Sequence, residues 1–112
     1  MDHDLALPAR IRALPVVKDE PLHLVRRLAA DGCEVQFITA GSGYEHPMHS
    51  HDTHNVTVIV SGRFTVAIEE EGKRSVGPGE WYESQPGQMH AIWSEADTIA
   101  IELRFAVDQS TE

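Results

Sequence analysis

Two histidines one residue apart, His49 and His51, are the side chains of this sequence best suited to carry chemistry. Side chains of a β-strand alternate between its two faces, so this spacing places both imidazoles on the same face. Two neutral imidazoles that converge are the beginning of a transition-metal site. A polar residue, Asn55, follows four residues after His51. The spacing therefore predicts a metal-binding segment.

The residues around this pair extend the pattern in both directions. Gly43 is followed by five residues, His49, one residue, His51, three residues, Asn55, six residues and Gly62. Glycines at the two ends are typical of turns that bound a strand.

A second segment carries a third histidine. Gly79 is followed by five residues, the run Gln85-Pro86-Gly87, two residues and His90, with Ser94 four residues further on. The two segments resemble the two sequence motifs of the cupins, and the chain is similar to the small single-domain members of that family. Together with the stretch between them, the motifs span residues 43–94 of the 112.

The resemblance implies an all-β fold, the double-stranded β-helix or cupin jelly-roll barrel, in a single domain over residues 1–112. Within it, residues 1–14 are expected to form an N-terminal arm and residues 108–112 a tail. The resemblance also implies one bound divalent transition-metal ion. Its identity is open, because Fe, Mn, Ni, Cu, Co and Zn all accept imidazole ligands. The expected ligands are His49, His51, Asn55 and His90.

Asn55 stands where the family usually has a glutamate ligand. Its carbonyl oxygen is a neutral and weaker donor, so the metal would keep its full positive charge and suit an anionic or chelating substrate. Water or His54 are the alternatives for the fourth position, although alternation along the strand turns His54 outward. Two further departures, Gln85 for proline and Ser94 for asparagine, do not touch the chemistry directly.

The resemblance implies a metal-dependent enzyme that acts on a small organic molecule, with a dioxygenase-type oxidoreductase as the leading reaction. A redox-neutral lyase or isomerase is the alternative within enzymes, and a non-catalytic module that binds or senses a small ligand is the alternative outside them. Glu83 is the candidate acid or base, against the simpler interpretation of a solvated carboxylate at a strand edge. His46 is read as a rim residue or as a proton shuttle.

Most of the remaining chain has the pattern of short strands, which is typical of a sandwich or barrel. Helix is the competing interpretation for the first of these segments, residues 22–30. Two hairpins are expected, one around Asp31-Gly32 and one around Ser61-Gly62-Arg63. The predicted strands are Leu22–Ala29, Cys33–Ala40, Val56–Val60, Phe64–Ile68, Glu80–Ser84, His90–Trp93 and Thr98–Phe105.

Strand parity separates inward from outward side chains. If Asn55 points inward, Thr57 and Ile59 do as well, and three valines point outward, namely Val56, Val58 and Val60. An apolar outer face needs a cover, so we expect either the N-terminal arm or, in a homodimer, a second subunit to lie over it. The inward parity predicts a small dry pocket lined by apolar residues: Ile59, Ile92, Ile101, Leu103 and Phe37.

Composition excludes several classes of function. A net charge of −9 with only 9 lysines and arginines argues against a nucleic-acid partner. No apolar stretch approaches the length of a membrane span and the first residues do not resemble a secretory signal, so the cytoplasm is the expected location. Cys33 is the only cysteine, which excludes an internal disulfide, and its alternation with Val35 and Phe37 predicts a core residue.

Overall fold

The computed structural model describes residues 7–107, so the predicted tail and the first six residues of the predicted arm lie outside the described residues. None of the helices described is long and apolar enough to cross a membrane. The elements are α1 (Ala9–Arg12), β1 (Val16–Glu20), β2 (His23–Ala30), β3 (Cys33–Ala40), β4 (Glu45–His49), β5 (His54–Ser61), β6 (Phe64–Ile68), β7 (Gly72–Val76), β8 (Trp81–Ser84), β9 (His90–Ser94) and β10 (Thr98–Phe105).

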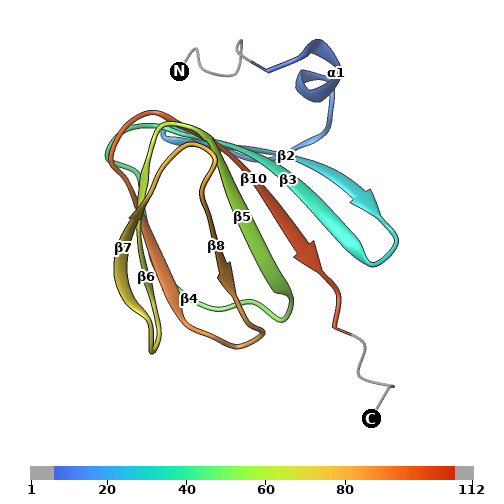
Figure 1. The fold of residues 1–112 in the computed structure, drawn as a ribbon. Coiled ribbons are helices and arrows are strands. Elements are labelled where there is room, and N and C mark those ends of the chain that lie inside the picture. The colour runs from blue at the N-terminus through green and yellow to red at the C-terminus, as the bar shows by residue number, and fades with distance from the viewer. Residues whose placement is uncertain (1–6, 108–112) are drawn as a thin grey trace.

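The strands form two antiparallel sheets that face each other (Figure 1). The larger sheet has the order β1-β2-β3-β10-β5-β8 and the smaller has the order β4-β9-β6-β7. Apolar side chains from both sheets meet between them, and Ile59 of β5 and Phe64 and Val66 of β6 are almost completely buried. The predicted all-β jelly-roll architecture is confirmed.

The first predicted hairpin is confirmed. β2 and β3 pair in register from His23 opposite Ala40 to Ala30 opposite Cys33, and Gly32 in the turn has a φ of +77°. Glycine adopts this left-handed conformation without the steric cost of a Cβ. The helical alternative for residues 22–30 is therefore wrong.

The second predicted hairpin is wrong, because the chain crosses from one sheet to the other at Ser61-Gly62-Arg63. β5 pairs with β10 and β8, whereas β6 pairs with β7 and β9. Gly62 has a φ of +87°, and a Cβ there would lie 2.4 Å from the carbonyl oxygen of Asp97. The crossing places the buried faces of β5 and β6 opposite each other, which a hairpin within one sheet does not allow.

The predicted parity holds for β5 but fails for β10. Two consecutive residues of β10, Ile99 and Ala100, are both buried, and the register against β5 shifts between them. Such a bulge reverses which residues face inward. Consequently Glu102 faces inward and is 8% exposed, whereas Ile101 and Leu103 are half-buried on the outer face.

The outer face of the larger sheet is apolar over β3 as well as β5. Phe37 and Cys33 are half-buried, so the prediction of Cys33 as a core residue is wrong. Val56 and Val58 are half-buried and Val60 is 49% exposed. Residues 7–14 lead into β1, at the opposite side of the sheet from β5, so the described part of the arm does not cover these valines. Homodimer formation stays a prediction.

Candidate metal centre

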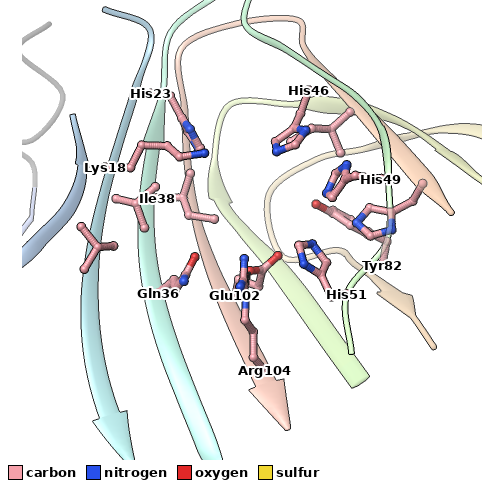
Figure 2. Close-up of a pocket in the computed structure, with 14 residues that line it drawn as sticks. Lys18, His23, Gln36, Ile38, His46, His49, His51, Tyr82, Glu102 and Arg104 are labelled. Atoms are coloured by element: carbon pink, nitrogen blue, oxygen red, sulfur yellow. Dashed lines mark hydrogen bonds and ion pairs between the residues drawn. The ribbon is translucent and has the colours of Figure 1, made fainter. Parts of the chain in front are cut away.

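A cavity of about 280 Å³ opens between the two sheets. Side chains of β1, β2, β3, β8 and β10 form one part of its wall, and the motif histidines form the other (Figure 2). The predicted apolar lining is wrong, because only Ile92 of the five expected residues lies on the wall. The wall is instead mixed, because apolar side chains such as Val25 and Ile38 lie beside the charged side chains that the bulge in β10 points into the cavity.

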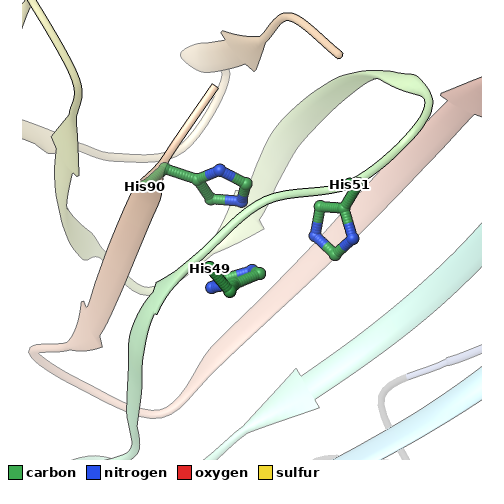
Figure 3. Close-up of side chains that lie close together, drawn as sticks. All are labelled: His49, His51 and His90. Carbon is green, nitrogen blue, oxygen red and sulfur yellow. The ribbon is translucent and has the colours of Figure 1, made fainter. Parts of the chain in front are cut away.

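Three of the predicted ligands meet on this wall. His49 ends β4, His51 lies in the loop that follows, and His90 begins β9. One ligand nitrogen from each ring lies within 4.8 Å of the others, and the ring centroids are 4.2–5.2 Å apart (Figure 3). The sequence pattern therefore brings the three histidines together as predicted, although His51 is beyond the end of the strand.

Backbone hydrogen bonds hold the two motif segments against each other. His49 pairs with His90 in the ladder between β4 and β9. The Gly87 N–H donates to the carbonyl oxygen of His51 at 2.8 Å. Gly87 has a φ of +79°, a conformation that favours glycine, so the turn before His90 can approach the loop of His51.

Two of the rings are oriented by their Nδ1 atoms. Nδ1 of His49 lies 2.7 Å from the carbonyl oxygen of Pro47, and Nδ1 of His90 lies 3.2 Å from that of Gln88. A carbonyl oxygen only accepts, so each Nδ1 carries the proton and each Nε2 keeps a free lone pair. A hydrogen bond of this kind fixes the tautomer of a metal-binding histidine.

Burial favours the neutral form of two of the three imidazoles, those of His51 and His90. Burial, followed by the charge of Arg104, lowers the pKa of His51 to about 4. Burial also lowers the pKa of His90. Because a metal binds only the deprotonated nitrogen, a lowered pKa favours binding at neutral pH. In donor type and grouping, the triad fits a divalent transition metal.

Asn55, the predicted fourth ligand, is 2% exposed but is not among the residues that line the cavity. Its Oδ1 accepts a hydrogen bond from the Thr53 hydroxyl at 2.5 Å, and its Nδ2 is buried with no hydrogen-bond partner in the described chain. Coordination by Asn55 stays a prediction.

His54 and Glu83 lie away from the cavity. His54 points outward, as strand alternation predicts, and its Nε2 is 2.8 Å from Oε2 of Glu83. Their side chains are 35% and 47% exposed, and neither lines the cavity.

The cavity contains functional groups that sequence reasoning missed. Glu102 and Arg104 of β10 form an ion pair of 2.6 Å, and the Thr57 hydroxyl lies 3.4 Å from the other oxygen of Glu102. Tyr82 of β8 also lines the cavity, and burial, followed by the charge of Glu102, raises its pKa. The available signal was the appearance of two charged residues within the otherwise apolar run Thr98–Phe105.

His46 and His23 also line the cavity. His46, predicted at the rim, stacks on His49 with 3.8 Å between ring centroids. Burial, followed by the proximity of His49, lowers the pKa of His46. His23 is 6% exposed and stacks on Tyr44. The cavity wall therefore has five histidines, of which three form the triad.

No family model matches the sequence, and no curated protein matches it. Solved structures do. An RmlC-like cupin from Shewanella frigidimarina is 16% identical, with 89% of this chain and 90% of that chain covered and a TM-score of 0.75. A variant of oxalate decarboxylase from Bacillus subtilis is 17% identical, with coverage of 91% and 29% and a TM-score of 0.76. The DMSP lyase DddQ from Ruegeria pomeroyi is 19% identical, with coverage of 81% and 50% and a TM-score of 0.69. The chain thus has the cupin fold, which confirms the resemblance drawn from its motifs.

Proposed function

We propose that the protein is a metal-dependent enzyme that carries out redox-neutral proton transfer, of the lyase or isomerase type, on a small organic molecule. One observation carries the proposal: the histidine triad and the buried carboxylate of Glu102 line the same cavity. A metal at His49, His51 and His90 would supply a Lewis acid that polarises an oxygen of the substrate.

Glu102 is suited to act as the base. Its carboxylate is held on one side by Arg104 Nε at 2.6 Å and on the other by the Thr57 hydroxyl at 3.4 Å. These contacts fix the carboxylate in the cavity, where it can accept a proton from a bound molecule. A fixed position within reach of the substrate is the first requirement of a general base.

Tyr82 is suited to act as a proton donor. The residue is 5% exposed, and its raised pKa keeps the hydroxyl protonated at neutral pH. A base and a neutral donor in one cavity are what an elimination or isomerisation requires, since one proton is removed and another is delivered.

The dioxygenase reaction favoured by the sequence would use the same triad, and it remains the competing candidate. The presence of Glu102 and Tyr82 at the cavity wall supports proton transfer more directly than oxygen chemistry, because an oxygenase does not need this acid and base. The names of two similar structures, a decarboxylase and a lyase, agree with this choice.

The test uses metal-reconstituted protein and a panel of small hydroxy and keto acids in D₂O without oxygen. NMR is expected to show solvent-dependent hydrogen exchange or elimination that is lost in both His51→Ala and Glu102→Gln. Glu83→Gln is the matched control and is expected to retain activity, since Glu83 lies on the outer face. Turnover that requires oxygen and consumes it would support the dioxygenase instead.

A further inference from the structure

Strand β1 places a lysine, Lys18, at the wall of the cavity beside Val17. Both Val17 and Lys18 line the cavity, but Val17 is 48% exposed and its neighbour Val16 is 45% exposed, whereas Lys18 is half-buried. This is the reverse of the usual preference, in which valine is buried and lysine is exposed. The register against β2 shifts between Val16 and Lys18, and bulges of this kind redirect side chains near functional sites.

In the part of the chain that the structure describes, the charge of Lys18 has no ion-pair partner. Within residues 7–107, no carboxylate oxygen lies within ion-pair distance of its ammonium group. Figure 2 shows Lys18 reaching into the cavity beside His23, with Arg104 and Glu102 at the other end. Arg104 is neutralised by Glu102 at 2.6 Å, so the uncompensated positive charge of the cavity lies at the Lys18 end.

His23 contributes an unused polar atom at the same end. The residue is 6% exposed, and its Nδ1 is buried without a hydrogen-bond partner in the described chain. Oε1 of Glu20 is 3.8 Å from this nitrogen, which is beyond hydrogen-bond distance. Buried polar atoms are nearly always paired, so an orphaned nitrogen at a cavity wall indicates a missing ligand or water.

From this geometry we infer that Lys18 and His23 form a binding site for the carboxylate of a small organic acid, whose other end lies at the triad and Glu102. The inference rests on the proposed function for the role of that other end. An ammonium group and an imidazole N–H can donate to the two oxygens of one carboxylate. The cavity volume of about 280 Å³ is room for about nine water molecules at roughly 30 Å³ each, so the acid is small.

The test is an NMR titration with succinate, its neutral analogue succinamide, and inorganic phosphate. Wild-type protein is expected to bind succinate with shifts at Lys18 and His23, and to bind the other two at least tenfold more weakly. Lys18→Met is expected to raise the Kd for succinate about tenfold or more, and Lys18→Arg to keep it within about threefold. Lys73→Met is the matched control, because Lys73 is an exposed lysine of β7, and it is expected to leave the Kd unchanged.

The titration is run on both metal-free and metal-loaded protein. If the protein bound no metal or had no turnover, the proposed function would be contradicted. The titration of metal-free protein would still test whether Lys18 and His23 bind a carboxylate. Equal succinate affinity in Lys18→Met and wild type would overturn the carboxylate site, as would an equal loss in Lys73→Met or no succinate binding at all. Tighter binding of phosphate than succinate, with the same dependence on Lys18, would overturn the assignment to a carboxylate.

Discussion

Nε of Arg104 lies 2.6 Å from Oε1 of Glu102, and both side chains enter the histidine-lined cavity from the same face of β10. Residues two apart on a strand share a face, so the bulge at Ile99 and Ala100 carries both of them inward together. The ion pair therefore lets the protein keep a carboxylate in the same cavity as the three histidines without leaving the charge of that carboxylate unpaired.

Glu102→Gln is expected to lower turnover by about 10²- to 10⁴-fold, the range for loss of a general base, while metal content stays unchanged.

Arg104→Met leaves the carboxylate of Glu102, a side chain that is 10% exposed, without its cation. We therefore expect the free energy of unfolding of this variant to be about 3 kcal/mol lower than that of wild type. The double variant, Glu102→Gln with Arg104→Met, should recover part of this loss when its free energy of unfolding is measured in urea. If Arg104→Met destabilises the protein no more than the double variant does, the two residues are not coupled.

His51→Ala is expected to strip the metal far more thoroughly than Asn55→Ala. His51 offers a neutral imidazole from the triad, whereas Asn55 Oδ1 already accepts the Thr53 hydroxyl and water can replace an amide ligand. Metal analysis of the purified variants measures this difference. Equal metal content in the two would contradict the ranking.

Stability is expected to fall as the pH drops from about 6.5 toward 4, in part because of His23. Burial, followed by the charge of Lys18, lowers its pKa from 6.5 to about 4, so the folded state prefers the neutral ring. The unfolded chain binds a proton below pH 6.5 that the folded chain does not bind until about pH 4. The free energy of unfolding is therefore about 2 kcal/mol lower at pH 5, and this decrease is absent above pH 7.

His23→Gln removes this titration and leaves the other histidines in place. Urea unfolding at pH 7.5 and pH 5 should therefore show a smaller pH-dependent loss in His23→Gln than in wild type. The same loss in both proteins would mean that His23 is not held in its neutral form.

The protein is expected to be a homodimer whose interface covers Val56, Val58 and Val60. Each valine that becomes fully buried contributes about 1.5–3 kcal/mol, which favours association. Light scattering should find a dimer for wild type, a monomer for Val58→Glu, and a dimer for the control Val16→Glu on the distant strand β1. A wild-type monomer would rule out this interface.

The sequence predicted the parts of the site that depend on local spacing. His49, His51 and His90 were placed together because their motifs have fixed spacing, and the inward parity of Asn55, Thr57 and Ile59 followed from simple alternation.

The rest of the site depends on features that alternation does not contain. The bulge between Ile99 and Ala100 reversed the parity of β10, so the sequence indicated Ile101 where the structure presents Glu102. Lys18 belongs to no element that the sequence predicted, and only the pairing of β1 with β2 brings it to the cavity. The crossing at Gly62 depends on contact with Asp97 and Thr98, which are distant in sequence.

The most direct test of the account is the coordination of a divalent metal in reconstituted protein, measured by a crystal structure together with X-ray absorption. The account predicts one metal per chain with nitrogen ligands from His49, His51 and His90 at about 2.0–2.2 Å. Metal bound elsewhere, or a metal-loaded structure in which any of the three rings points away from the ion, would contradict it.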